Sequence, residues 1–251
     1  MPAKRLVPLV LAGALVAALC CAAAAQAVPS RMIALGAGTS KNTLYSFSGG
    51  DLNTVTVTPV TGLVGSNLVG ISFRPADGQL YGVGIGGNTA TVFRIDPGSG
   101  VATPVGSATQ ATLGGAPSYG VDFNPVTDRL RVVSGLESGV GTNINNFRLN
   151  PNSGVIAGVD TDLNYTALPG GEGANRPLAT IAFDRNVFGA TASTVLGITA
   201  AANDSLVRLG PPFVANPANP FIAQNAAGTD FKRSFSKFAF HSIRAVASYR
   251  F

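Results

Sequence analysis

One six-residue segment occurs three times in this chain, as GISFRP at residues 70–75, GVDFNP at residues 120–125 and TIAFDR at residues 180–185. Phe73 is followed after 50 residues by Phe123 and after a further 60 residues by Phe183. Apolar and polar residues alternate within the segment, which is the period-two pattern of a half-buried β-strand. Self-similarity at a period of this size is typical of repeat proteins.

Two more segments follow each copy. The second is strand-like, and its copies are LYGVG (80–84), LRVVS (130–134) and LGIT (196–199). The third joins a strand to a turn, and its copies are VFRIDPGSG (92–100), NFRLNPNSG (146–154) and the weaker LVRLGP (206–211). Asp or Asn before Pro, with Gly four residues after the Asp or Asn, predicts a tight hairpin turn. A fourth strand is predicted after the first two turns, at residues 101–105 and 155–159.

Each repeat therefore contains four short strands in about 50 residues, which is the content of one β-propeller blade. With a partial unit at residues 31–59, we expect an all-β, β-propeller-like array of about four four-stranded antiparallel blades over residues 28–220. A two-sheet sandwich or a solenoid is the alternative, although a sandwich does not require this self-similarity. The composition of 31 Gly, 16 Pro and only 12% charged residues argues against a coiled coil or a long helical bundle.

Residues 1–27 predict a secretory signal peptide that is cleaved after Ala27. Lys4 and Arg5 precede an uncharged apolar run, and small residues stand before the cleavage position. A permanent membrane anchor is the alternative, but the run is shorter than the roughly 20 apolar residues that span a bilayer. We therefore expect a secreted protein, periplasmic or extracellular, without stable membrane insertion. Both cysteines lie in this segment, so the remainder has no thiol for a disulfide or a metal site.

The formal net charge of +5 belongs to the two ends of the chain. Residues 28–231 carry ten Lys and Arg against twelve Asp and Glu, and five more basic residues lie in the last twenty positions. We therefore expect no nucleic-acid partner. Residues 221–251 lack the repeat motifs, and we expect either a poorly ordered tail or a divergent closing strand. Their alternating end resembles the last strand of an outer-membrane barrel, but the repeats are too short and too turn-rich for lipid-facing strands.

Residues 70–84, 121–134 and 146–151 together resemble the core of a bacterial family of secreted proteins built on one domain of unknown function, family 4394 of that series. The resemblance covers residues 32–212. It implies an exported, propeller-like domain, and it carries over no activity, ligand or catalytic residue. After Pro212 the chain departs from the Gly-rich repeat strand with which members of the family continue.

Six polar residues of the third unit and the following hairpin form the candidate binding site, and they are Asp122, Asn124, Asp128, Arg129, Arg131 and Arg148. Carboxylates and guanidinium groups near a propeller channel can bind an acidic or sugar ligand through bidentate hydrogen bonds. The structural interpretation is that Asp122 and Asn124 flank a turn, that Asp128 caps it, and that the arginines pair with them between blades. Polar turn residues occupy the equivalent positions of the other copies, which favours the structural interpretation.

The sequence predicts no cofactor and no metal ion. Residues 160–164 place oxygen ligands at the first, third and fifth positions of a calcium loop, but the sixth position is Tyr165 and the twelfth is Gly171. A glycine spacing typical of dinucleotide-binding loops begins at Gly82, but a strand-like segment follows it instead of a helix. The single histidine, His241, lies in the divergent tail, which excludes a zinc site or a Ser-His-Asp triad from the repeats.

Three classes of function remain open. The leading hypothesis is a non-catalytic exported propeller that binds a ligand, a glycan or a protein. An extracellular carbohydrate hydrolase or lyase would use paired carboxylates, such as Asp122 and Asp128, roughly 5 to 10 Å apart in an open cleft. A structural protein of the cell envelope or matrix would have no concave polar pocket.

Overall fold

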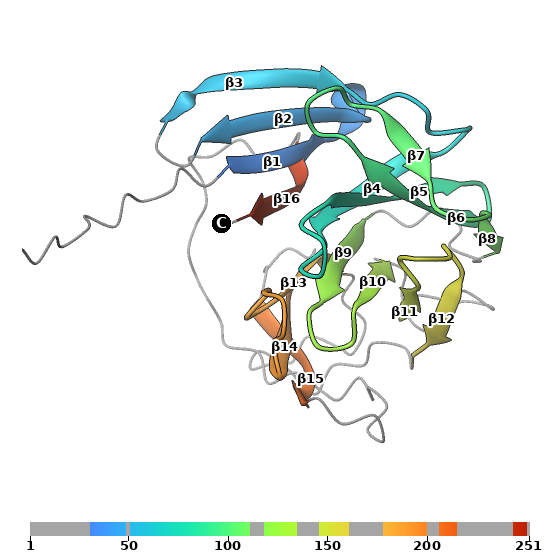
Figure 1. Cartoon of the computed structure of the whole chain (residues 1–251), viewed down its shortest axis with the longest axis vertical. Helices are drawn as coiled ribbons and strands as arrows, with labels where there is room; N and C mark the ends of the chain where they lie inside the picture. The colour runs from blue at the N-terminus through green and yellow to red at the C-terminus, as the bar shows by residue number, and fades with distance from the viewer. Residues whose placement is uncertain are drawn as a thin grey trace, which may run out of the picture.

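The computed structural model describes residues 31–48, 51–110, 118–134, 146–160, 178–199, 206–214 and 243–249 of the chain. Within these residues the protein is all-β, as the sequence predicts, and the one helical element is a single 3-10 turn, Gly38–Ser40. The strands form four antiparallel sheets (Figure 1). None of the described residues forms a helix long and apolar enough to cross a membrane. The predicted signal peptide, residues 1–27, lies outside the described residues.

The four sheets are numbered in the order of their first strands. Sheet 1 has the order β16-β1-β2-β3, with β1 Arg31–Gly36, β2 Thr43–Ser48, β3 Asp51–Pro59 and β16 Ile243–Tyr249. Sheet 2 has the order β4-β5-β6-β7, with β4 Asn67–Phe73, β5 Leu80–Gly86, β6 Thr89–Ile95, β7 Ala102–Pro104, and β8 Thr109–Gln110 also paired to β6. Sheet 3 has the order β12-β11-β10-β9, with β9 Tyr119–Asn124, β10 Arg129–Ser134, β11 Asn146–Leu149 and β12 Ile156–Val159. Sheet 4 has the order β13-β14-β15, with β13 Leu178–Phe183, β14 Ala192–Thr199 and β15 Leu206–Val214.

The repeated segments occupy equivalent strands of successive sheets. The three copies of the first segment begin in β4, β9 and β13, which are the end strands of sheets 2, 3 and 4, and run into the turns that follow. The second segment forms β5, β10 and β14, and the third forms β6, β11 and β15. The long turn between β13 and β14 spans residues 184–191 and accounts for the longer spacing of the third repeat.

The hairpin turns after β6 and β11 form as the sequence predicts. The Asp96 Oδ1 atom accepts backbone hydrogen bonds from Gly98 at 2.7 Å and from Ser99 at 3.0 Å. The amide of Gly100 donates to the carbonyl of Asp96 at 2.8 Å, and Gly100 has a φ of +76°. A Cβ at Gly100 would also meet the carbonyl oxygen of Pro59. The turn therefore requires glycine for two reasons, its positive φ and the close approach of sheet 1.

One end strand of each sheet lies toward the middle of the molecule, and these are β16, β4, β9 and β13 (Figure 1). Strand β4 contacts both β9 and β16, and β13 also contacts both β9 and β16. Strand β16 comes from residues 243–249, and it pairs antiparallel with β1 from Arg31 opposite Tyr249 to Gly36 opposite Ile243. The two ends of the described chain therefore meet in one sheet. The predicted boundary between a repeat domain and a tail at residues 220 and 221 falls outside the described residues.

The buried apolar residues of the described ranges form three clusters, each between neighbouring sheets. The cluster between sheets 1 and 2 contains Ile33, Leu35, Leu44, Ile71, Leu80, Phe93 and Ile95. The cluster between sheets 2 and 3 contains Tyr81, Val83, Val92, Val121, Phe123, Leu130, Val132 and Phe147. The cluster between sheets 3 and 4 contains Val133, Leu178, Ile181, Phe183, Val195, Val207 and Leu209. The rings of Tyr81 and Phe123 meet edge to face, with centroids 5.3 Å apart, so an aromatic contact joins sheets 2 and 3.

Candidate functional site

All six candidate residues from the sequence lie in sheet 3 or in its β9–β10 turn, so the sequence brings together residues that are neighbours in space. Asp122 and Asn124 lie on β9, Arg129 and Arg131 lie on β10, and Asp128 ends the turn between these strands. Arg131 is opposite Asp122 on one side and opposite Arg148 of β11 on the other.

Asp122 lies within the inner strand β9 and joins three sheets, instead of flanking a turn as the sequence suggested. Its Oδ1 atom accepts a hydrogen bond of 2.6 Å from the hydroxyl of Ser72 on β4. Its Oδ2 atom accepts a hydrogen bond of 2.6 Å from the amide of Phe183 on β13. Although the residue as a whole keeps some solvent exposure, burial of the carboxyl group raises its pKa to about 6. The carboxyl group thus links sheets 2, 3 and 4 at the middle of the molecule.

Asn124 is the residue that organises the β9–β10 turn. It is 2% exposed, and its Oδ1 atom accepts backbone hydrogen bonds from Val126 at 2.9 Å and Thr127 at 3.2 Å. Asp128 closes the turn by donating its amide to the carbonyl of Asn124 at 2.9 Å, and it adopts a left-handed φ of +50°. Asn and Asp tolerate this conformation better than most residues. Asn124 therefore flanks the β9–β10 turn, which is the place that the structural interpretation gives it.

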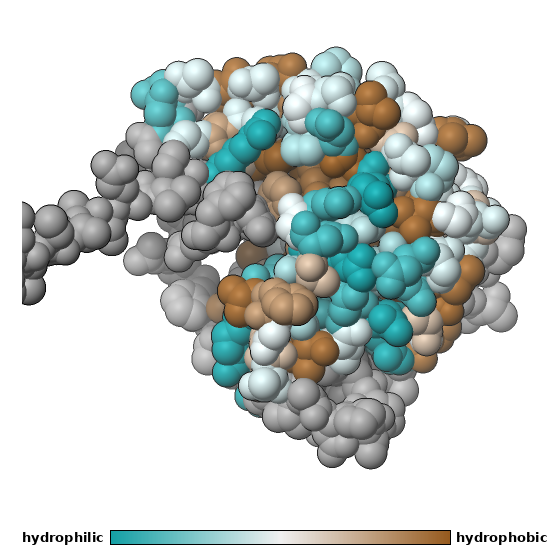
Figure 2. Space-filling model, viewed as in Figure 1, coloured by the Kyte–Doolittle hydropathy of each residue, from teal (hydrophilic) through white to brown (hydrophobic). Residues whose placement is uncertain are grey.

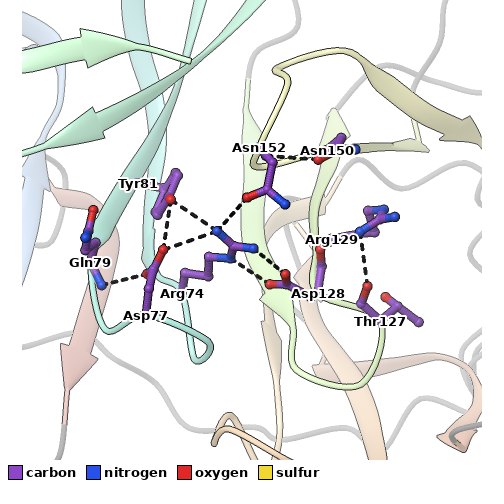
Figure 3. A network of polar contacts seen from close by, with 9 residues as sticks. All are labelled: Arg74, Asp77, Gln79, Tyr81, Thr127, Asp128, Arg129, Asn150 and Asn152. Atoms are coloured by element: carbon purple, nitrogen blue, oxygen red, sulfur yellow. Dashed lines mark hydrogen bonds and ion pairs between the residues drawn. The ribbon is translucent and has the colours of Figure 1, made fainter. Parts of the chain in front are cut away.

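Arg74 is the centre of a polar network that the sequence analysis missed (Figure 3). Its Nε atom donates to Asp128 Oδ1 at 2.8 Å, and its Nη2 atom donates to Asp128 Oδ2, so the guanidinium group holds both carboxylate oxygens. Its Nη1 atom donates to Asn152 at 2.9 Å, to Asp77 at 3.2 Å and to the Tyr81 hydroxyl at 3.3 Å. The contact with Asp128 holds the pKa of Arg74 above its ordinary value.

The Arg74 network joins sheet 2 to sheet 3 through their turns. Arg74 and Asp77 belong to the β4–β5 turn, Asp128 to the β9–β10 turn and Asn152 to the β11–β12 turn. The residue after the repeated Phe is Arg74 in one copy but Asn124 and Asp184 in the others, so only the first copy carries a cation at this position. The partner of Arg74, Asp128, lies four positions after Asn124, so the ion pair does not join equivalent positions of two repeats.

Arg131 and Arg148 share one buried carboxylate, that of Asp160. Arg131 donates to Asp160 Oδ2 at 2.9 Å and to Asn146 Oδ1 at 2.6 Å. Arg148 binds both Asp160 oxygens, at 3.0 Å from Nε and 2.9 Å from Nη2. The Arg131 and Asp160 side chains are 1% and 3% exposed, and burial lowers the pKa of Arg131 to about 10. Asp160 is therefore occupied by two arginines, and residues 161–164 of the calcium-like pattern lie outside the described residues.

Arg129 differs from Arg74, Arg131 and Arg148 because it has no ion pair with a carboxylate among the described residues. Its Nη1 atom donates to the carbonyl oxygens of Asp128 at 3.0 Å and Thr127 at 3.4 Å. Its Nε and Nη2 atoms make no hydrogen bond within the described part of the chain. Arg94, an exposed residue of β6, also has no ion pair there, and its guanidinium group lies 6.0 Å from the centroid of the Tyr81 ring.

The residues of the Arg74 network and of the neighbouring turns share one face of the molecule. We name it the turn-face patch, and it consists of Arg74, Asp77, Gln79, Thr127, Asp128, Arg129, Asn150 and Asn152. Figure 2 shows hydrophilic residues gathered over the middle of this face, where Figure 1 has the β4–β5 and β9–β10 turns. Across the described ranges there is no group of three or more His, Cys, Asp or Glu side chains that could hold a metal ion.

The two carboxylates suggested as a catalytic pair have different surroundings. Asp122 is bonded to Ser72 and to the backbone of Phe183 near the inner strands. Asp128 is held on both oxygens by Arg74 at the turn. No hydrogen bond in the described part of the chain links the two carboxyl groups, either directly or through one shared side chain.

Comparison with known proteins gives one match. The family described as Domain of unknown function (DUF4394) matches residues 43–231 of the chain. No curated protein and no solved structure matches it.

Proposed function

The chain belongs to the family of the Domain of unknown function (DUF4394), and we propose from its geometry that it is an exported, non-catalytic binding domain with the architecture of a four-bladed β-propeller. The family assignment agrees with the resemblance seen in the sequence. Because the description of the family includes no activity, the function is inferred from the residues of this chain.

The contacts between sheets support the propeller architecture. The inner strands β16, β4, β9 and β13 contact one another in a cyclic order, and the three core clusters fill the spaces between successive sheets. Radial repetition of four-stranded sheets around an axis has these two features. In this arrangement β16 completes the sheet that β1 begins, so the last strand of the chain closes the ring.

Export of the protein is proposed from the sequence of residues 1–27. A basic start, an apolar run and small residues before the cleavage position are the three parts of a secretory signal peptide. On this proposal the mature protein begins at Val28, three residues before β1. It then works in the periplasm or outside the cell.

Binding is favoured over catalysis by the use of the carboxylates. All seven Asp side chains in the described ranges accept hydrogen bonds from the protein itself, and they are Asp51, Asp77, Asp96, Asp122, Asp128, Asp160 and Asp184. A general base must reach a substrate proton, and a carboxylate held by an arginine is poorly placed to do so. The use of all these carboxylates within the protein is the observation that carries the proposal of a non-catalytic domain.

The unused groups of the turn-face patch are mostly hydrogen-bond donors. Arg129 keeps its Nε and Nη2 donors, Asn152 uses only its Oδ1 atom on Arg74, and the Gln79 side-chain amide makes no hydrogen bond within the described part of the chain. Arg94 adds a second cation beside Tyr81. Donors and cations of this kind complement a ligand rich in acceptor oxygens, and guanidinium groups bind carboxylates in bidentate fashion. We therefore propose an acidic glycan as the ligand.

The experiment is a binding titration of the secreted protein, expressed as the full chain, against uronate-containing and neutral oligosaccharides on a glycan array. We expect binding to the acidic glycans, with weaker binding as salt concentration rises. Replacing Arg129 by Ala removes one charge-assisted contact of about 1.5 to 3 kcal/mol, so affinity should fall about tenfold or more.

The matched control is Arg208→Ala, which removes an exposed arginine from β15 in sheet 4, away from the patch residues. Its affinity should equal that of the wild type. Equal loss in both variants would indicate a general charge effect, and no binding to any acidic glycan would refute the proposed ligand. Cleavage of an oligosaccharide during the incubation would contradict the non-catalytic assignment and favour the hydrolase or lyase hypothesis.

A further inference from the structure

Strand β3 forms the outer edge of sheet 1 among the described strands. It spans nine residues, Asp51–Pro59, and it is the last strand in the order β16-β1-β2-β3. Figure 1 shows it along the outside of the molecule. Residues 53–57 are all exposed, although their side chains alternate between the two faces of the sheet. No described residue buries this stretch, and no described strand pairs with its outer edge, which therefore offers backbone donors and acceptors.

The outer strands of the other sheets are shorter or contain internal prolines. Strand β3 pairs regularly with β2 from Thr56 to Pro59 and has a register shift between Thr56 and Asp51. Strand β7 has three residues and ends in Pro104, and β12 has four residues. Strand β15 is as long as β3 but contains Pro211 and Pro212, which cannot donate to a neighbouring strand. In β3 the one proline is the last residue, Pro59, and no ionisable residue lies between positions 52 and 60. Natural edge strands are normally shortened, charged or interrupted to prevent pairing with another chain.

The sequence of β3 is symmetric about Thr56. Positions 54–58 read Thr-Val-Thr-Val-Thr, which is the same in both directions. In an antiparallel pair of two such strands centred on this residue, Thr56 faces Thr56 of the other copy, and each Val55 faces a Val57. Cross-strand pairs of β-branched residues and of threonines stabilise antiparallel sheets. A two-fold interface requires this self-complementarity.

We propose that β3 is a homodimerisation edge, on which a second copy of this chain pairs antiparallel through its own β3, with Thr56 on the two-fold axis. The pairing joins two copies of sheet 1 into one continuous sheet in the order β16-β1-β2-β3-β3-β2-β1-β16. Dimerisation pairs the outward-pointing backbone groups within residues 53–57, which belong to alternate residues. It also covers the side chains of Val55 and Val57, which are 45% and 56% exposed in the single chain. The proposal is independent of the ligand at the turn-face patch.

The proposed register makes a specific test possible, because each Val55 faces a Val57 of the other copy. The double substitution Val55→Lys and Val57→Lys places lysines opposite lysines in the dimer. The double substitution Val55→Lys and Val57→Glu places each Lys opposite a Glu of the other copy. Both variants change only exposed positions, so the fold of the single chain is retained.

The experiment measures the mass of the secreted protein by sedimentation equilibrium over a concentration series, with the fold of each variant checked by thermal unfolding. We expect a reversible dimer for the wild type, an increase of about tenfold or more in the dimer dissociation constant for the Lys/Lys variant, and recovery of the dimer in the Lys/Glu variant. The matched control Val159→Lys, an exposed valine on the short outer strand β12, should dimerise like the wild type.

Three results would overturn the proposal. A wild-type protein that is monomeric at all concentrations excludes the dimer. A dimer that survives in the Lys/Lys variant shows that another surface forms the interface. Loss of the dimer in both double variants, without recovery in the Lys/Glu variant, excludes the register centred on Thr56.

Discussion

Replacing Arg74 by Ala tests how strongly the turn network holds sheets 2 and 3 together. The Arg74 side chain is 10% exposed, and it binds both oxygens of Asp128, the carboxylate of Asp77 and the amide oxygen of Asn152. The substitution removes all of these donors at once. It leaves two carboxylates without their cation and leaves the Tyr81 hydroxyl with Asp77 as its partner.

The size of the effect follows from the exposure of the groups left behind. Removing one partner of a fully buried ion pair costs about 3 to 5 kcal/mol, because the other charge stays uncompensated. The Asp128 and Asp77 side chains are 35% and 27% exposed, so water recovers part of that cost. We expect the free energy of unfolding to fall by about 2 to 3 kcal/mol, which lowers the Tm of a chain of this length by roughly 5 to 10 °C.

The assay is urea unfolding of the wild type and the variant, followed by circular dichroism. Asp128→Asn is the matched control, since Asn tolerates the left-handed backbone at this position and still accepts a hydrogen bond from Arg74. Its cost should be smaller, about 1 kcal/mol. A loss below about 0.5 kcal/mol for Arg74→Ala, the range of an ordinary surface substitution, would refute the role of the network.

Two further predictions concern pH and backbone geometry. The folded-state pKa of Asp122, about 6, lies above its ordinary value of 3.8, so protonation of this carboxyl group favours the folded state. Its contribution to the free energy of unfolding is complete below pH 3.8 and is lost as the pH rises through 6. When the pH falls from 7 to 4, protonation of Asp122 should raise the free energy of unfolding by as much as about 3 kcal/mol. Urea titrations of Asp122→Asn at the two pH values should lack this increase. An unchanged pH dependence in the variant would contradict the assignment. Gly154→Ala should cost more than Gly65→Ala, because both glycines have φ near +75° but a Cβ at Gly154 also meets the carbonyl of Val105, whereas nothing lies within 4 Å of a Cβ at Gly65. We expect about 1 kcal/mol for Gly65 and several times that for Gly154 in the same unfolding assay, and equal losses would show that the close contact is absent.

Sequence reasoning predicts the strands of sheets 2, 3 and 4 because the repeat fixes their order and their turns. The side chain of Asp96 and the dihedral angle of Gly100 form the hairpin turn, so residues close in sequence are sufficient to predict this turn. Sheet 1 is different, since its strand β16 lies more than 190 residues from β1 along the chain. Nothing in the local pattern of residues 243–249 specifies which strand they pair with, and this pairing depends on where the other sheets leave an open edge.

The candidate site was predicted in part. The six residues do gather in sheet 3, because neighbours in a β-hairpin are fixed by register. Their partners were harder to predict, since Asp122 binds Ser72 and Phe183, which lie 50 and 61 residues away, and Asp128 binds Arg74 at a distance of 54 residues. Such contacts follow from how the sheets pack against each other. Equivalent positions of successive repeats single out Arg74 as the one cation, but they do not identify Asp128 as its partner.

A crystal structure of the secreted full chain tests the central claim most directly, namely that four sheets close into one ring. We expect that β4, β9, β13 and β16 surround a common axis, that β16 pairs with β1 with Ala34 opposite Val246, and that Asp122 bridges to Ser72 and Phe183. A structure in which the outer edge of β1 is free, or in which β4, β9 and β13 lie in one continuous sheet, would contradict it.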